Sequence, residues 1–382
     1  MTRGTRSKMH ILHTEASCGW GGQELRILSE STGMIGRGHR ITLACPPEAT
    51  IAREAVAAGL EVVTLPIGRK RPAGLFAMRR LLATGGYDVV NTHSSTDAWL
   101  VALASTTLRG APPMVRTRHI SAPIAQSLSN RWLYSEASRF VVTTGESLRE
   151  DVILRTGCDP DRVASIPTGI DDIRFAPADR SQARRELGLP EDRTIVGIVA
   201  TLRSWKGHRF LIDAVASLND PKLLLVIVGD GPQFEALGRQ VAEGGLADRV
   251  MLTGRRDDVP TWMQAFDLFA LPSYANEGVP QALVQAMLCG LPCVTTSAGA
   301  ITEVAIDGRT ALIVPQQDIA GLAAGVAKLA GDLVLRATLG RAAREHCRNG
   351  FTREAMLDRM EAVFARACGA TTAARTLRDG AA

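Results

Sequence analysis

The sequence predicts two α/β domains, each built on a parallel sheet, that face each other across a cleft. Short apolar runs of strand length alternate with stretches of helical periodicity, and this alternation occurs twice along the chain. Such alternation is typical of parallel sheets covered by helices on both faces. At 382 residues the chain is also longer than one ordinary hydrophobic core supports, so two domains are expected.

The first predicted domain opens with a strand, a glycine-rich turn and a helix, at Met9–Thr14, Ser17–Gln23 and Glu24–Ile35. This arrangement can hold a phosphate group at the start of the helix. Its glycines do not match the dinucleotide fingerprint G-x-G-x-x-G. Further strands are predicted at Arg40–Cys45, Glu61–Leu65, Asp88–Thr92, Met114–Arg118 and Arg139–Thr143.

Two histidines directly follow predicted strands of this domain. His93 comes after Asp88–Thr92, and His119 comes after Met114–Arg118. Ligands of open α/β sheets bind at the carboxyl ends of the strands. A single histidine is more often structural than catalytic, but two at equivalent strand ends strengthen the case for a direct role.

The second predicted domain repeats the alternation after a segment rich in turn-forming residues. Ile166–Pro177 and the polar run Asp179–Arg185 indicate the boundary. We expect a first domain at residues 1–172, a second at 173–352, and a final helical segment with a frayed tail, from 368, at 353–382. The predicted strands are Thr194–Ala200, Leu223–Val228, Val250–Gly254, Asp267–Leu271, Leu291–Thr296 and Ala311–Val314, and the late helices are Ile319–Ala330, Leu333–Arg348 and Phe351–Ala367.

Two cations follow the first strand of the second domain. Arg203 and Lys206 stand on the loop that precedes a predicted helix at Phe210–Ser217. Fixed cations at this place suit a diphosphate and the charge that develops on it as it leaves. The pair alone is better explained as solvated surface charge, but a carboxylate motif further along the chain favours the binding role.

That motif is the stretch Leu271–Thr296, which reads as strand, loop, helix and strand. Glu277 lies in the loop before an apolar helix at Gln281–Cys289. Pro280 suits the first helical position, and Gly290 suits a left-handed cap at the end. The free N–H groups at the start of such a helix can hold an anionic ligand, which Glu277 would help to select.

The charge of the chain is uneven. Residues 1–140 carry 17 Lys and Arg against 9 Asp and Glu, whereas the formal net charge of the whole chain is +5. The basic first half is expected to meet something acidic. Gly68–Leu82 is basic and amphipathic and could lie on an anionic membrane. A surface helix with its apolar side on the core is the slightly favoured explanation.

The composition excludes several other classes of protein. A hydrophobic content of 46% with 22% charged residues is typical of a globular protein. No apolar run approaches the roughly 20 residues that span a bilayer, and the polar start is not followed by a secretory core. Seven scattered cysteines without Cys-x-x-Cys argue against a disulfide framework or a zinc knuckle and fit a reducing cytosol.

The motif around Glu277 resembles the signature of the retaining GT-B glycosyltransferases of family 4 ("group 1"). That signature places a second glutamate eight residues after the first, followed by a small-residue-rich helix end. Here the second position is Gln285, so an amide replaces the acid. The resemblance covers about residues 9 to 367, and it includes a hinge-like segment at Ile166–Pro177 and the turn Ser297–Glu303.

The resemblance implies transfer of a sugar from a nucleotide-sugar with retention of configuration, and a last helix that crosses back to the first domain. Glu277 and His119 would be the catalytic residues, and His93 would lie near the acceptor. Fixed cations would replace a metal ion, so neither metal nor cofactor is expected. The donor-binding residues would be Arg203, Lys206, Gly21, Gly22, Arg255, Gly278, Val279 and Gln285.

Several alternatives stay open at this point. A nicotinamide oxidoreductase is disfavoured by the missing fingerprint, and a nonenzymatic nucleotide-sugar binder by the intact Arg203, Lys206 and Glu277. A GT-B epimerase or phosphorylase is the nearest enzymatic alternative. The expected partners are a nucleotide-sugar, a glycan or lipid-linked acceptor of bacterial cell-surface polysaccharide or lipopolysaccharide, and an anionic membrane surface, with no nucleic acid. The expected location is the cytoplasm, with a peripheral contact to the inner face of the cell membrane.

Overall fold

The computed structural model describes residues 8–119, 122–275 and 277–379, and these form two compact units. Unit 1 comprises the chain up to Gly169 together with the segment from Arg353 onward, and unit 2 is Ile170–Thr352. The division therefore falls after Gly169 rather than after residue 172. The final helical segment is part of the first unit, because its contacts lie there.

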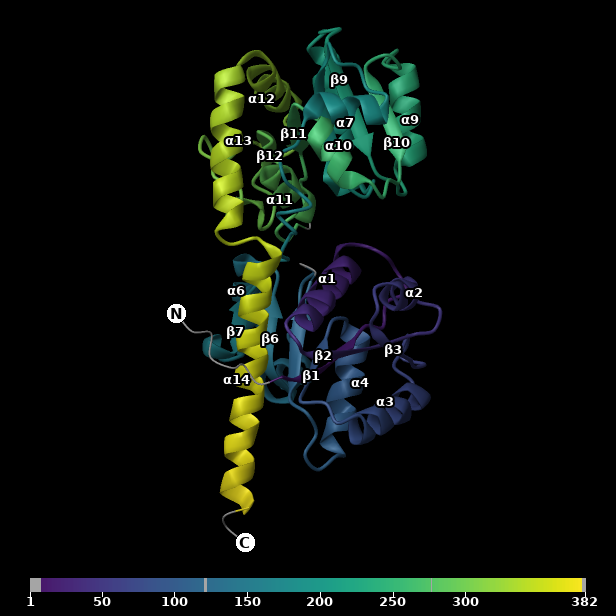
Figure 1. Cartoon of the computed structure of the whole chain (residues 1–382), viewed down its shortest axis with the longest axis vertical. Helices are drawn as coiled ribbons and strands as arrows, with labels where there is room; N and C mark the ends of the chain where they lie inside the picture. Colours follow the sequence, from purple (N-terminus) through teal and green to yellow (C-terminus); the bar gives the residue numbers. More distant parts are fainter. Residues whose placement is uncertain (1–7, 120–121, 276, 380–382) are drawn as a thin grey trace. The chain divides into compact units, whose positions relative to one another are not determined.

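Unit 1 is built on a parallel sheet with the strand order β3-β2-β1-β4-β5-β6-β7 (Figure 1). The last strand was not expected, because a three-residue run in a polar stretch carries too little hydrophobic signal. The strands are β1 His10–Thr14, β2 Arg40–Cys45, β3 Glu61–Thr64, β4 Val89–Thr92, β5 Met114–Arg118, β6 Ser138–Thr143 and β7 Val163–Ser165.

The helices of unit 1 begin and end close to the expected positions, with two corrections. The first helix begins at Gly22, so part of the expected glycine-rich turn is helical. The last helix continues to Asp379, so the expected frayed tail is helical up to that residue, and 380–382 lie outside the described residues. The helices are α1 Gly22–Gly36, α2 Thr50–Ala57, α3 Pro72–Thr84, α4 Ser95–Thr106, α5 Leu128–Arg131, α6 Glu146–Thr156 and α14 Arg353–Asp379, with a π-helical turn at Trp132–Ala137 and a 3-10 turn at Pro160–Arg162.

Strand alternation divides the core of unit 1 between the two faces of its sheet. Ile11 and Val89 pack with Leu357 of α14 in one apolar cluster, whereas their neighbours Leu12 and Val90 pack in the other. Figure 1 shows α14, in yellow, running along this sheet. A β-carbon at Gly33 of α1 would lie 2.4 Å from the Leu357 side chain, so this glycine permits α1 and α14 to approach closely.

The basic-amphipathic segment forms α3 and the turn before it. Met78 and Leu82 are buried in the unit 1 core, as the surface-helix explanation expects. Phe76 on the same helix is 70% exposed. The basic residues Arg69–Arg71 precede the helix, and Arg71 is its N-cap.

Unit 2 contains a second parallel sheet with the order β10-β9-β8-β11-β12-β13. Its core is one apolar cluster on both sides of β8, β9 and β11. The strands are β8 Thr194–Val199, β9 Leu223–Val228, β10 Val250–Gly254, β11 Leu268–Leu271, β12 Cys293–Thr296 and β13 Leu312–Val314. The helices are α7 Arg180–Leu187, α8 His208–Ser217, α9 Phe234–Glu243, α10 Val259–Ala265, α11 Gln281–Leu288, α12 Ile319–Gly331 and α13 Leu333–Arg348, with 3-10 turns at Ser204–Lys206 and Ile301–Glu303.

The polar run expected to be a linker is a helix inside unit 2. Asp179 caps α7 by accepting hydrogen bonds from the backbone N–H groups of Ser181 and Gln182. Arg184 of this helix forms a buried ion pair with Asp267 at 2.6 Å. The run looked like a linker because its polar residues, which cap the helix and form ion pairs, carry little hydrophobic signal.

In each sheet the strand order reverses once, because later strands are added on the opposite side of the first strand. In unit 1 the reversal lies between β1 and β4, and in unit 2 it lies between β8 and β11. The loops at the carboxyl ends of two such strands diverge and leave room for a ligand. The candidate residues are therefore best assessed at these two places.

Candidate functional site

The loops at the reversal point of unit 2 carry an ion pair. Lys206 follows β8 in the turn Ser204–Lys206, and Glu277 lies in the loop after β11. Their Nζ and Oε1 atoms are 2.6 Å apart, and the side chains are 19% and 6% exposed. The sequence predicted both residues as ligand contacts, but it did not predict that they bind each other. The pairing leaves two further Nζ protons on Lys206 for other acceptors.

A glycine lets the Lys206 loop pack on the Glu277 loop. Gly207 has a φ of +76°, and a β-carbon there would lie 2.1 Å from the carbonyl oxygen of Pro272. The backbone N–H of Tyr274 donates to the carbonyl of Trp205 at 2.9 Å. Any other residue at 207 would push the two loops apart, so Gly207 supports the Lys206–Glu277 contact.

A second glycine holds the other side of Glu277. Gly299 has a φ of +54°, and a β-carbon there would lie 2.1 Å from the carbonyl oxygen of Glu277. The backbone N–H of Ala300 donates to that oxygen at 3.1 Å. This explains the family-like turn Ser297–Glu303: it fixes the backbone of Glu277 from the β12 side.

Arg203 shares the loop with Lys206 but is exposed. Its guanidinium carbon lies 5.7 Å from the centroid of the Trp205 ring, a cation–π distance. Arg203 therefore remains accessible to an anion beside Lys206. Arg255, on the loop after β10, has a side chain that is 63% exposed and lies 3.6 Å from Asp257.

Three further predicted donor residues, Gly278, Val279 and Gln285, lie before or on α11. Gly278 and Val279 precede the helix, and no residue in the described part of the chain accepts a hydrogen bond from their backbone N–H groups. Pro280 is the N-cap rather than the first helical residue, which corrects the expectation. Gly290 ends the helix with a φ of +76°, as expected. Gln285 is half-buried on α11.

A buried histidine beside Lys206 was not predicted. His208 is the first residue of α8 and is 2% exposed, and both of its ring nitrogens lack a hydrogen-bond partner among the described residues. Burial, and then the charge of Lys206, lower its pKa to about 3. His208 is therefore a neutral side chain under the Lys206 loop.

At the reversal point of unit 1, three histidines form a hydrogen-bonded chain. His13 Nδ1 lies 2.8 Å from His93 Nε2, and His93 Nδ1 lies 2.9 Å from His119 Nε2. The ring planes are inclined by 16° and 28°, so the imidazoles are nearly coplanar. His13 and His93 are buried and His119 is half-buried. The structure thus brings the two predicted histidines together and adds a third.

A carboxylate and an arginine close the buried end of this chain. Glu30 Oε1 lies 3.9 Å from His13 Nε2, and Glu30 Oε2 lies 3.6 Å from Arg26 Nε. Asn91 Nδ2 donates to Glu30 at 3.3 Å. Burial raises the pKa of Glu30 to about 7, while Arg26 and the Asn91 hydrogen bond lower it.

Two buried acidic residues, Glu15 and Asp97, lie after the carboxyl ends of β1 and β4. Asp97 accepts hydrogen bonds from the Thr14 hydroxyl at 2.6 Å and from the backbone N–H of His93 at 2.9 Å. Glu15 is buried and accepts from the backbone N–H of Ser17 at 2.7 Å. Burial, and then the charge of Asp97, raise the pKa of the Glu15 carboxyl to about 8.

The glycine pair lies at the start of α1. Gly21 is its N-cap with an extended φ of −174°, and Gly22 is its first residue. Gln23 donates to Glu15 through its side chain. The helix start is therefore tied to the Glu15 loop at the sheet edge.

Comparison with known proteins identifies the family. Residues 20–174 match the family described as Glycosyltransferase Family 4, and residues 179–346 match Glycosyl transferases group 1. A D-inositol 3-phosphate glycosyltransferase of Salinispora arenicola is 33% identical over an alignment of 315 positions that covers 72% of this chain and 68% of that protein. The chain belongs to the group 1, family 4 glycosyltransferases.

Further relatives carry the same name at lower identity. The D-inositol 3-phosphate glycosyltransferase of Salinispora tropica is 32% identical, with 72% of this chain and 64% of that protein covered. The one from Mycobacterium tuberculosis strain F11 is 29% identical over an alignment of 340 positions, which covers 81% of this chain and 68% of that protein.

Solved structures place this glycosyltransferase in the GT-B fold. A glycosyltransferase from Rickettsia africae aligns with a TM-score of 0.85 at 19% identity, covering 94% of this chain and 98% of that one. Anabaena HepE in complex with UDP-glucose aligns with a TM-score of 0.81 at 23% identity, covering 94% and 100%. Two parallel-sheet domains, as the sequence predicted, are confirmed.

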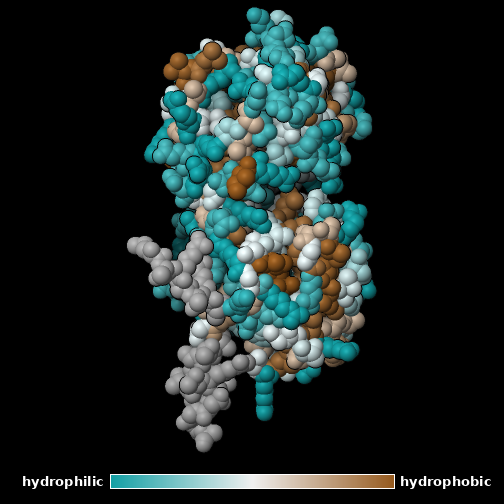
Figure 2. All heavy atoms as spheres, in the orientation of Figure 1, coloured by the Kyte–Doolittle hydropathy of each residue, from teal (hydrophilic) through white to brown (hydrophobic). Residues whose placement is uncertain are grey.

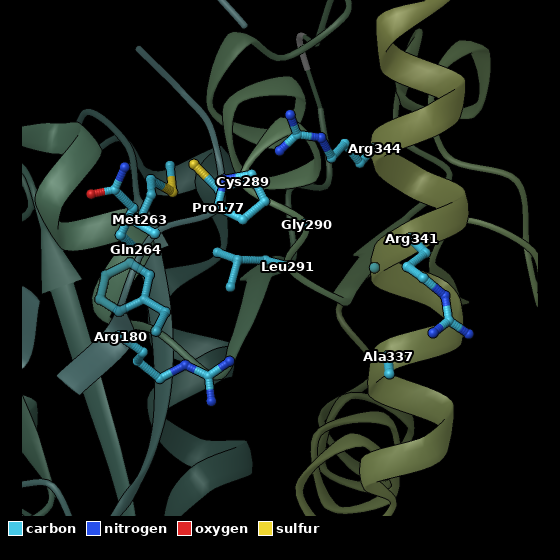
Figure 3. A pocket seen from close by; sticks show the side chains of 13 residues that line it. Pro177, Arg180, Met263, Gln264, Cys289, Gly290, Leu291, Ala337, Arg341 and Arg344 are labelled. Carbon is cyan, nitrogen blue, oxygen red and sulfur yellow. The ribbon is translucent and has the colours of Figure 1, made fainter. Parts of the chain in front are cut away.

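A pocket of about 260 Å³ lies elsewhere in unit 2 of this glycosyltransferase. Its lining includes Pro177 and Arg180 at and before the start of α7, Gly290 after α11, and Arg341 and Arg344 of α13. Figure 3 shows Arg341 and Arg344 on one helix, with Pro177 and Leu291 across from it. It sits at the amino ends of β11 and β12, whereas Lys206 and Glu277 follow carboxyl ends. None of the predicted site residues lines it.

Sequence reasoning missed His13, Glu30, Glu15 and Asp97. His13 lies inside a strand, where a histidine gives no motif, and its partner His93 is 80 residues away. A structural role for Asp97 could have been predicted, because the spacing of Ser94 and Asp97 is that of a capping box, which they form at α4. In the described part of the chain, no group of three or more His, Cys, Asp or Glu is arranged to hold a metal ion.

Proposed function

We propose that this glycosyltransferase moves a sugar from a nucleotide-sugar to a hydroxyl of a glycan, glycolipid or phosphorylated acceptor, with retention of the anomeric configuration. The observation that carries the proposal is the Lys206–Glu277 pair, 2.6 Å apart, on the loops that flank the reversal point of unit 2. It puts a cation for a leaving phosphate next to a carboxylate for a cationic sugar.

The two cations of the β8 loop would bind the diphosphate. Arg203 is exposed, and Lys206 is partly exposed with donors to spare beyond Glu277. The unpartnered N–H groups before α11 lie on the adjoining loop and suit phosphate or sugar oxygens. As the bond to the sugar breaks, negative charge grows on the diphosphate and these groups stabilise it.

Retention is supported by what surrounds Glu277. Retaining glycosidases use two carboxyl groups about 5 Å apart, one of them as nucleophile. Here the charged partner of Glu277 is a lysine. This arrangement favours a front-face route in which Glu277 stabilises the oxocarbenium-like centre and the leaving phosphate takes the proton of the acceptor hydroxyl.

The donor and acceptor proposals start from the relatives. A structural neighbour was solved with UDP-glucose, so a UDP-sugar is the first donor to test. The relatives named D-inositol 3-phosphate glycosyltransferase make an inositol phosphate a candidate acceptor. The basic balance of the first half suits such a phosphorylated acceptor as well as an anionic glycolipid.

A peripheral membrane contact from the cytoplasm is part of the proposal. Figure 2 shows apolar side chains on the surface of unit 1 in the region of α2, β3 and α3. Val56 of α2 and Phe76 of α3 are 63% and 70% exposed, and the basic residues Arg69–Arg71 directly precede α3. Within the described residues, the structure has no helix with the length and hydropathy of a bilayer span.

The test is a nucleotide-release assay across UDP-, GDP- and ADP-sugars, with inositol 3-phosphate and a lipid-linked glycan as acceptors. The proposal expects release that depends on one donor and one acceptor, without added metal or cofactor. Binding without turnover would favour a nonenzymatic nucleotide-sugar binder. Turnover that returns an isomerised nucleotide-sugar without an acceptor would favour an epimerase.

A further inference from the structure

The histidine chain of unit 1 has two ends with different surroundings. At the buried end, His13 Nε2 faces Glu30 and has no hydrogen-bond partner among the described residues. At the other end, the nitrogen of His119 that His93 does not use is Nδ1, on a half-buried ring. A group that determines which nitrogen of His13 carries the proton therefore also determines whether His119 Nδ1 carries one.

A neutral chain of three imidazoles has only two consistent proton arrangements, because each ring carries one N–H and each short contact holds one proton. In the first arrangement, every N–H points toward Glu30, and His119 Nδ1 carries no proton. In the second, every N–H points toward His119, and its Nδ1 is a donor. The chain is neutral because burial lowers the pKa of His13 to about 3 and that of His93 well below its usual value.

The surroundings of Glu30 favour the first arrangement. Asn91 donates to Glu30 through its amide, and the Thr117 hydroxyl fixes that amide by donating to Asn91 Oδ1 at 2.8 Å. Arg26 supplies a positive charge on the other side of Glu30. A carboxylate that accepts a hydrogen bond from Asn91 and lies near the Arg26 charge attracts an N–H, and it repels a nitrogen lone pair, on His13 Nε2 at 3.9 Å.

We propose that Glu30 and His13 are positioning residues that, through His93, hold His119 in the tautomer with Nε2 protonated and Nδ1 free to accept a hydrogen bond from a substrate hydroxyl. The identity of that hydroxyl as one on the donor sugar or the acceptor rests on the proposed function. A neutral acceptor nitrogen suits a sugar hydroxyl, since it orients the hydroxyl without bringing a positive charge to the substrate.

The tautomer can be measured without any substrate. Nitrogen-15 NMR of the histidine-labelled protein at about pH 8 distinguishes a proton-free ring nitrogen from a protonated one. We expect His119 Nδ1 to give the proton-free signal in the wild type and to lose it in Glu30→Gln, because the amide NH₂ can donate to His13. His10→Gln is the matched control, because His10 lies on β1 like His13 but contacts Thr42 rather than the histidine chain.

A wild-type spectrum with His119 Nδ1 protonated would overturn the proposal even if no variant folds. Kinetics supply the second readout: Glu30→Gln should lower kcat by roughly tenfold or more with little change in the donor KM. A loss of kcat with an unchanged His119 tautomer would reduce Glu30 to a structural residue. Failure of the wild type to transfer any sugar would reject the proposed function and leave the tautomer result standing.

Discussion

Replacement of Lys206 by alanine should reduce both stability and turnover. Lys206 Nζ and Glu277 Oε1 are 2.6 Å apart, and Glu277 is only 6% exposed. The substitution therefore leaves a nearly buried carboxylate without its charged partner. Breaking a buried pair by removing one partner costs about 3–5 kcal/mol. Because Lys206 is 19% exposed, we expect the lower end, about 3 kcal/mol. Loss of leaving-group stabilisation should also cut turnover about a hundredfold or more, which corresponds to about 2.7 kcal/mol in the barrier.

A second substitution separates the two effects. The double variant Lys206→Ala/Glu277→Gln has no unpaired buried charge at this place. Most of the lost stability should therefore return, while turnover stays low. The assay combines urea unfolding with steady-state turnover at saturating donor. Lys222→Ala, an exposed lysine of the same unit, is the matched control and should leave both unchanged. Near-normal turnover of Lys206→Ala would refute the reasoning.

Four further outcomes follow from the same structure. Gln285→Glu should keep turnover within roughly tenfold, because an amide or an acid can bind ribose, whereas Glu277→Gln should lower kcat at least about a hundredfold; steady-state kinetics giving the reverse order would contradict this. Activity should survive EDTA, and a loss that Mg²⁺ or Mn²⁺ restores would show a metal requirement. Flotation with anionic liposomes should weaken with salt and when Arg69–Arg71 become serine, at about 1 kcal/mol per basic residue; equal binding to neutral liposomes would count against the contact. The pKa of Glu15 is raised from its usual 4.5 to about 8, so the folded state keeps a proton that the unfolded state releases. Glu15 should therefore lower stability between about pH 5 and 8, by at most about 1.4 kcal/mol per pH unit. Urea unfolding of Glu15→Gln should show a shallower decline than the wild type, because Glu30, whose pKa is raised to about 7, still contributes.

The fold could be predicted because its signal is local. Buried parallel strands are short continuous apolar runs, and their alternation with helices was visible in both halves of the sequence. Errors occurred where polar residues serve a structural purpose. Asp179 caps α7 and Arg184 pairs with Asp267, so that helix looked like a linker.

The candidate site could be predicted only in part. Lys206 and Glu277 stood out because each lies on a loop after a strand, but their contact depends on how two loops pack through Gly207 and Gly299. His13 and Glu30 could not be found, because their role comes from strand order rather than from any local pattern. Long-range pairing of buried polar groups is therefore the part that the sequence leaves open.

The most direct test of the central claim is the anomeric configuration of the first-formed product, followed by proton NMR with the nucleotide-sugar that supports release. The account predicts that the donor sugar is transferred with its configuration retained, and that Lys206→Ala and Glu277→Gln both abolish most of this transfer while Lys222→Ala does not. An inverted product, or full transfer by the Glu277→Gln variant, would contradict it.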